Sequence, residues 1–102
     1  MTFGQIIARH RKEAGLSQRD LANLIMKEDG TPISAQYLND IERDRRNPPP
    51  NHLLNQFAER LGLSREYLYF LAGELPTDIR KLQLDPKQVE DGFKAFRRTI
   101  TG

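Results

Sequence analysis

Two side-chain amides, those of Gln36 and Asn39, lie about one helical turn apart in a segment with the pattern of a short helix. An amide donates and accepts at the same edge, which lets Gln or Asn form two hydrogen bonds with an adenine base in the major groove. Arg43, Arg45 and Arg46 follow at once, and guanidinium groups suit phosphate oxygens. Either feature alone is also typical of a solvated helix face. The chemistry that they indicate together depends on the elements that carry them.

The helix that carries the amides is predicted to begin after Ser34, a residue type that caps helix N-termini. Its apolar residues, Leu38 and Ile41, lie three apart and predict the face that turns to the core. The opposite face is polar and is expected to be exposed. The expected base contacts are Gln36 and Asn39, with Ala35, Tyr37 and Asp40 as secondary candidates.

The composition is that of one small globular domain. The chain has 102 residues, of which 37% are hydrophobic and 29% charged, and its net charge of +2 does not by itself demand a nucleic-acid partner. Cysteine is absent, which excludes disulfides and thiolate metal sites and is typical of cytosolic proteins. No apolar run is long enough to span a membrane, and the N-terminus lacks the pattern of a secretory signal. We therefore expect a cytoplasmic protein with no membrane segment.

The two histidines, His10 and His52, are isolated from other residues that do chemistry. No cysteine, carboxylate cluster or glycine-rich phosphate loop accompanies them. Each is expected to pack or to contact backbone rather than to bind a metal or act as a base. The sequence predicts no catalytic residue, no metal site and no cofactor, so we do not expect an enzyme.

Cap residues and breakers divide residues 1–73 into five short predicted helices. Polar N-caps precede apolar residues at helical spacing, and glycines or prolines end the helices. The starts are marked by Thr2, Ser17, Ser34 and Ser64, and the ends by Gly15, Pro48–Pro50, Gly62 and Gly73. The fifth helix is expected to turn Tyr67, Leu68 and Leu71 inward. No segment alternates with a period of two residues, so we expect no sheet and an all-α fold class.

Four fragments, in order along residues 3–72, resemble the phage Cro/repressor-type (XRE-family) helix-turn-helix regulators. They are Gly15-Leu16-Ser17-Gln18 with Leu21-Ala22, then Tyr37-Leu38-Asn39-Asp40-Ile41-Glu42-Arg43, Arg45-Arg46-Asn47-Pro48, and Ala58-Glu59-Arg60-Leu61-Gly62-Leu63-Ser64. The second fragment is similar to the family's recognition helix, which enters the major groove. The resemblance implies a five-helix lambda-repressor-like DNA-binding domain over residues 1–73, followed by two additional C-terminal helices. It also implies a transcriptional regulator whose partner is double-stranded DNA.

The resemblance implies further roles around the recognition helix. Gln18 opens the second helix, where its side chain and the unpaired backbone N–H groups suit a phosphate. Arg11 and Glu42 occupy positions that form an ion pair between the first and third helices in the family, and such a pair would orient the recognition helix. The expected phosphate contacts are Gln18, Arg43, Arg45 and Arg46, with Arg19 and Lys27 as further candidates.

One stretch departs from the family pattern. The spacing from Gln18 to the end of the recognition helix is several residues longer than usual, and the excess falls in residues 26–32. Either the second helix is extended, or the turn bulges outward. Both options change the directions in which the Gln36 and Asn39 side chains point more than they change the fold.

Residues 74–102 are predicted to add two helices to the five-helix domain. A domain of this family needs no further helices to fold, so we interpret the extension as a dimerisation element with a self-complementary interface. The alternative is that these helices fold back and enlarge the core of the monomer. Tyr69 and Phe70 are expected to offer aromatic surface to the extension. The other expected interface residues are Leu75, Ile79 and Leu82 in one helix, and Val89, Phe93, Phe96 and Ile100 in the last.

Three functions fit this pattern. The leading one is a repressor that binds a palindromic operator as a homodimer. The second is an antitoxin, which binds DNA and also docks a toxin through its C-terminal helices. The third is an adaptor that uses the same fold to bind protein, for which an apolar outward face would be expected in place of the polar one. The sequence does not separate a regulator from an antitoxin.

Overall fold

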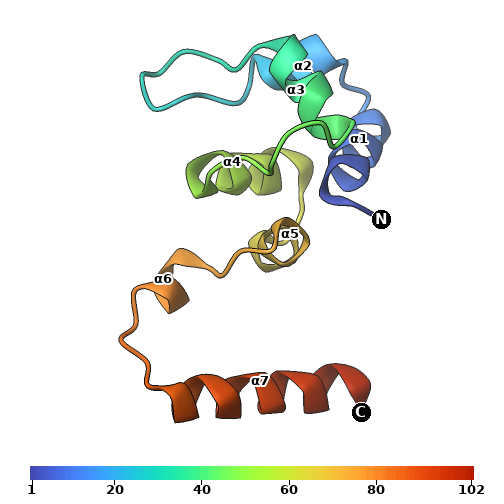
Figure 1. The fold of residues 1–102 in the computed structure, drawn as a ribbon. Helices are drawn as coiled ribbons and strands as arrows, with labels where there is room; N and C mark the ends of the chain where they lie inside the picture. Colours follow the sequence, from blue (N-terminus) through green and yellow to red (C-terminus); the bar gives the residue numbers. More distant parts are fainter.

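The computed structural model describes residues 1–102 and contains seven helices (Figure 1). They are α1 (Phe3–Glu13), α2 (Gln18–Ala22), α3 (Ala35–Glu42), α4 (Asn51–Leu61), α5 (Arg65–Ala72), α6 (Thr77–Arg80) and α7 (Pro86–Thr101). The one pairing of extended segments is an isolated antiparallel bridge between Met26 and Pro32. The predicted all-α class, with five helices followed by two more, is confirmed. None of the helices combines the length and apolar character that a membrane crossing requires.

The helices begin where the cap residues predict. Thr2, Ser17, Ser34, Ser64 and Asp85 are N-caps, and each side chain accepts a hydrogen bond from the backbone N–H three residues on. The caps of α1, α2 and α7 are complete capping boxes, because the third residue of the helix also bonds back to the cap backbone. Local sequence therefore sets most helix starts without help from tertiary contacts.

A single hydrophobic core joins α1 to α5. Its 16 buried residues lie between Phe3 and Tyr69. Helix α1 packs against α3, α4 and α5, and α2 packs against α3. Leu38 and Ile41 of α3 are buried in this core, as the spacing predicts, and the polar face of α3 is turned away from it.

The rotation of α5 differs from the prediction at two residues. Tyr67 was expected inward but is 42% exposed, and Tyr69 was expected at the surface but is only 5% exposed. The Tyr69 hydroxyl donates to Oδ1 of Asn55 on α4 at 2.5 Å, and this partner allows the whole ring to be buried. Tyr69 is therefore a core residue, whereas Phe70 remains exposed.

Helix α7 lies apart from the five-helix core, beyond the short α6 (Figure 1). Helix α6 is one turn long, so Leu75 and Leu82 lie outside it, and the hydroxyl of Thr77 accepts from Nδ2 of Asn51 on α4 at 2.8 Å. Every residue from Thr77 to Gly102 is exposed. The alternative in which these helices fold back and enlarge the core is therefore wrong.

The extra residues between α2 and α3 form a bulge, and α2 is not extended. Residues 26–32, which we call the 26–32 turn, project from the body as a narrow loop (Figure 1). The N–H of Lys27 donates to the carbonyl of Thr31 at 2.8 Å within it. Gln56 of α4 accepts from the Met26 N–H at 2.6 Å and donates to the Met26 carbonyl at 2.8 Å. These two bonds hold the base of the turn against α4.

Candidate nucleic-acid interface

Helix α3 presents a polar face on the side away from the hydrophobic core. Gln36 is exposed, and Ala35, Asn39 and Asp40 are half-buried along the same side of the helix. Four of the five predicted base contacts therefore lie together on one face. The fifth, Tyr37, is directed elsewhere.

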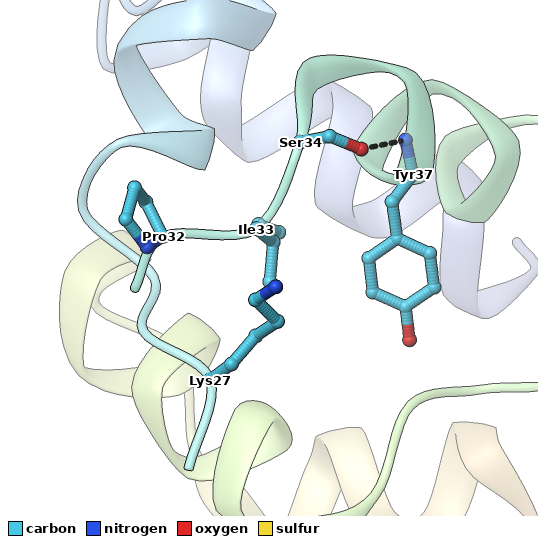
Figure 2. Close-up of a pocket in the computed structure, with 5 residues that line it drawn as sticks. All are labelled: Lys27, Pro32, Ile33, Ser34 and Tyr37. Carbon is cyan, nitrogen blue, oxygen red and sulfur yellow. Dashed lines mark hydrogen bonds between the residues drawn. The ribbon is translucent and has the colours of Figure 1, made fainter. Parts of the chain in front are cut away.

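Tyr37 lies across a pocket from Lys27 and Pro32 of the 26–32 turn (Figure 2). Its ring lies beside this shallow pocket, which is also lined by Lys27, Pro32, Ile33 and Ser34. It packs against the edge of the core, and the guanidinium carbon of Arg46 lies 5.2 Å from the ring centroid. This distance is that of a cation–π contact, so the Tyr37 ring stabilises the position of the Arg46 guanidinium group. Among the five base-contact candidates, Tyr37 is placed least favourably.

Gln18, at the first position of α2, is bonded to α3. Its Nε2 donates to Oδ1 of Asn39 at 3.1 Å and to Oε1 of Glu42 at 3.0 Å. At the same helix end, the Asp20 carboxylate accepts from the backbone N–H of Ser17, and this bond lowers the pKa of Asp20. The side-chain amide of Gln18 thus links α2 to the polar face of α3. The oxygen of this amide is left without a hydrogen-bond partner in the chain.

Arg11 and Glu42, expected to pair between the first and third helices, form a two-pronged ion pair in the structure. Arg11 donates from Nε to Oε2 of Glu42 at 2.7 Å and from Nη2 to Oε1 at 2.9 Å. Its Nη1 donates to the carbonyl of Leu16 at 2.8 Å. The side chains are only 10% and 5% exposed, and the bond to Glu42 raises the pKa of Arg11. The pair joins α1, the loop before α2 and the end of α3.

Comparison with known proteins identifies the architecture. Residues 4–74 match the family described as Helix-turn-helix domain. The chain belongs to this helix-turn-helix family. The predicted kinship with Cro/repressor-type regulators is confirmed, and because helix-turn-helix proteins place their second motif helix in the major groove, this chain is a DNA-binding regulator.

A solved structure described as the SinR protein/SinI protein complex is similar to this helix-turn-helix chain. The two chains are 25% identical, the match covers 99% of this chain and 100% of the other, and the TM-score is 0.56. No curated protein matches the chain. The structural similarity therefore extends beyond the helix-turn-helix domain into the C-terminal helices.

The predicted phosphate-binding cations of the helix-turn-helix domain differ in their surroundings. Arg43 caps the C-terminus of α3, and Arg43, Arg45 and Arg19 are exposed and form no ion pair within the chain. Arg46 pairs with Asp40, from Nε to Oδ2 at 3.4 Å. Lys27 lies in the 26–32 turn beside Asp29, whose pKa is lowered chiefly by bonds to Thr31 and to a smaller extent by the Lys27 charge. Because acidic neighbours offset its charge, Lys27 is the least favoured of the phosphate candidates.

Two residues that position α3, Asp44 and Gly4, and one that holds the turn before it, Gln56, are absent from the sequence prediction. Asp44 has a φ of +57°, and its Oδ1 accepts from the Gly4 N–H at 3.0 Å, which ties the start of α1 to the end of α3. Gly4 is required there, because a Cβ at this position would lie 2.3 Å from the Ile41 carbonyl oxygen. Gln56, which holds the 26–32 turn, is the third of these residues. Two sequence signals could have identified Gly4 and Asp44. One is a glycine inside a predicted helix, and the other is an Asp, a residue type that tolerates the left-handed region of backbone conformation.

Proposed function

We propose that this helix-turn-helix protein is a cytoplasmic transcriptional repressor that binds a palindromic operator as a homodimer. Residues 1–73 are the DNA-binding domain and residues 74–102 the dimerisation element. The observation that carries the proposal is the open polar face of α3, beside the exposed arginines that follow it. An adaptor that bound protein through α3 would be expected to present apolar residues there instead.

In this proposal α3 lies in the major groove, where Gln36 and Asn39 contact base edges. Ala35 and Asp40 lie beside them on the same face of the helix. The backbone phosphates are held by the main-chain N–H of Gln18 and by Arg19 at the start of α2, and by three arginines after α3, namely Arg43, Arg45 and Arg46. The amides supply specificity, and the cations supply affinity that does not depend on sequence.

Base readout predicts a selective loss. Replacing Gln36 with alanine is expected to weaken binding to the preferred site by about 1–3 kcal/mol and binding to random DNA much less. The measurement is a fluorescence titration of both duplexes with the full chain. Gln83→Ala, at an exposed glutamine between α6 and α7, is the matched control. Equal losses on the two duplexes would exclude Gln36 from base readout.

Phosphate binding predicts a change in salt dependence. Arg46→Gln is expected to weaken binding to every sequence and to reduce the slope of log affinity against log salt by roughly one unit. The slope comes from the same titration repeated over a range of salt concentrations. Lys81→Gln removes the same charge from an exposed site just after α6 and should leave the slope unchanged. If Arg46→Gln has the slope of the parent protein, this residue does not contact phosphate.

The dimer is proposed from the apolar stripe of α7. Val89, Phe93, Phe96 and Ile100 recur at intervals of four and three residues and are 40% to 61% exposed, so the stripe has no cover within one chain. A second copy would bury it and would place two recognition helices about 34 Å apart on one side of the duplex.

The same stripe supports a second candidate, an antitoxin that docks a toxin through α7. The similar solved structure is itself described as a complex of two proteins, which favours some protein partner for this chain as well. A toxin would replace the second copy on α7 without changing the DNA-binding role of α3. A dimer of the isolated protein would favour the first candidate, whereas a monomer would leave the stripe for a toxin or for a second copy that associates only on DNA.

A further inference from the structure

The hydrogen bonds on the face of α3 determine which end of each amide meets the DNA. Arginine only donates, a carboxylate only accepts, and a side-chain amide has one end of each kind. A series of hydrogen bonds that starts at an arginine therefore fixes the orientation of each side-chain amide in the series. It determines which end of the amide is the oxygen and which is the nitrogen. Two such series end on the face of α3.

The first series starts at the buried Arg11. Arg11 occupies both oxygens of Glu42, which remains an acceptor for Gln18. Gln18 must therefore turn its Nε2 toward Glu42, and the second hydrogen of Nε2 is donated to Oδ1 of Asn39 at 3.1 Å. Asn39 in turn keeps its oxygen toward Gln18. Both hydrogens of its Nδ2 are left for a partner outside the chain.

The second series starts at Arg46 and leaves an amide oxygen free. Arg46 donates to Oδ2 of Asp40 at 3.4 Å, and Nε2 of Gln36 donates to Oδ1 of the same carboxylate at 3.1 Å. A reversed Gln36 amide would set its oxygen against the carboxylate, which is repulsive. The oxygen of Gln36 is therefore left without a partner in the chain, beside the second hydrogen of Nε2.

We propose that Gln18 and Asp40 are positioning residues that give the two reading amides different polarity, with Asn39 offering donors alone and Gln36 offering an acceptor beside a single donor. Guanine presents two acceptors in the major groove, N7 and O6, whereas adenine and cytosine present the amino donors N6 and N4. Asn39 thus selects guanine, and Gln36 selects adenine or cytosine. This inference rests on the proposed base contacts of Gln36 and Asn39.

The test is Asp40→Asn in the full chain, with binding to a library of randomised duplexes followed by sequencing. Asparagine at position 40 has nearly the same shape but can donate, so it permits Gln36 to reverse. Gln36→Ala identifies the base position that Gln36 reads. At that position the parent protein is expected to prefer adenine or cytosine, and Asp40→Asn is expected to shift relative affinity toward guanine or thymine by about tenfold.

A second variant tests the first series. Gln18→Met keeps the length of the side chain but removes the bond that orients Asn39, so the preference at the position identified by Asn39→Ala is expected to fall by about tenfold. Gln83→Met is the matched control for this change, and Asp78→Asn, on the exposed α6, is the matched control for Asp40→Asn. Neither control should alter any base preference.

The outcomes distinguish the proposed polarity of the amides from the proposed base contacts on which it rests. If Asp40→Asn changes affinity for all sequences alike and keeps the parent base preferences, Asp40 acts through its charge alone and the polarity proposal is wrong. If Gln36→Ala and Asn39→Ala change no preference at any position, the proposed base contacts fail first, and the polarity proposal fails with them.

Discussion

Replacing Glu42 with alanine is expected to lower the free energy of unfolding by about 3–5 kcal/mol, because a buried arginine then loses its only carboxylate partner. Arg11 would keep one hydrogen bond, to the carbonyl of Leu16, while two of its donors would remain buried without acceptors. For a domain of this size the melting temperature should fall by more than about 10 °C. Thermal and urea unfolding, followed by circular dichroism, measure both quantities.

An exposed pair on the same molecule provides the control for Glu42→Ala. Glu13 accepts from Arg9 at 3.0 Å on the surface of α1, where both side chains are more than half exposed. Glu13→Ala should therefore cost no more than about 0.5 kcal/mol. The double variant Arg11→Met with Glu42→Leu should recover most of the lost stability, since an apolar pair needs no desolvation of charge. A cost below about 1 kcal/mol for Glu42→Ala would mean that water compensates Arg11 and that the pair does not hold α3.

Local signals were sufficient to predict most of the helix starts in this protein. A cap residue and the backbone N–H that it accepts from lie three residues apart, so the sequence contains the whole interaction. This is why Thr2, Ser17, Ser34 and Ser64 all mark true helix starts, and Asp85 caps α7 by the same local interaction. The inward residues of α3 followed in the same way from helical spacing, and with them the face that carries Gln36 and Asn39.

Where the sequence prediction was wrong or undecided, the deciding contact joins distant residues. The rotation of α5 depends on Asn55, which gives the Tyr69 hydroxyl a buried partner that no feature of α5 itself reveals. The course of residues 26–32 depends on Gln56, some 30 positions away in the sequence. A hydrophobic period cannot contain such information, because it treats tyrosine as merely apolar and glutamine as merely polar.

The same limit applies within the candidate interface. The sequence identified Gln18, Asn39 and Glu42 as separate residues with separate roles. Their polarity emerges only when tertiary structure brings one amide nitrogen within hydrogen-bonding distance of two oxygens on α3. Residue types therefore predicted which groups can read DNA, and the packing of α2 on α3 decides which atom of each group is presented.

Removing residues 74–102 is expected to reduce affinity for a palindromic operator by a factor on the order of 10²–10⁴, because two linked recognition helices bind far more tightly than one. Chain termination at Gly73 leaves all 16 core residues in place, so the shortened protein should keep its fold and bind a single half-site with unchanged affinity. Titrations of the full operator and of the isolated half-site measure the two quantities.

Point variants attribute this loss to the α7 stripe rather than to the length of the chain. Phe93→Ser with Phe96→Ser removes two exposed aromatic rings from the stripe and should abolish the dimer. Glu90→Ser with Lys94→Ser changes the same number of residues in α7, leaves the stripe intact and does not alter the net charge. Only the first pair should turn the sedimentation equilibrium of the full chain from dimer to monomer.

The decisive comparison is between the concentration at which the chain dimerises and the concentration at which it binds its operator. A dimer that forms in solution at or below the operator-binding concentration agrees with an α7 interface, and the paired phenylalanine variant should then weaken operator binding as much as truncation does. If the full chain remains monomeric well above that concentration, the α7 homodimer is wrong. The stripe would then have to be covered by a different protein, as the antitoxin candidate requires, or by a second copy that associates only on DNA.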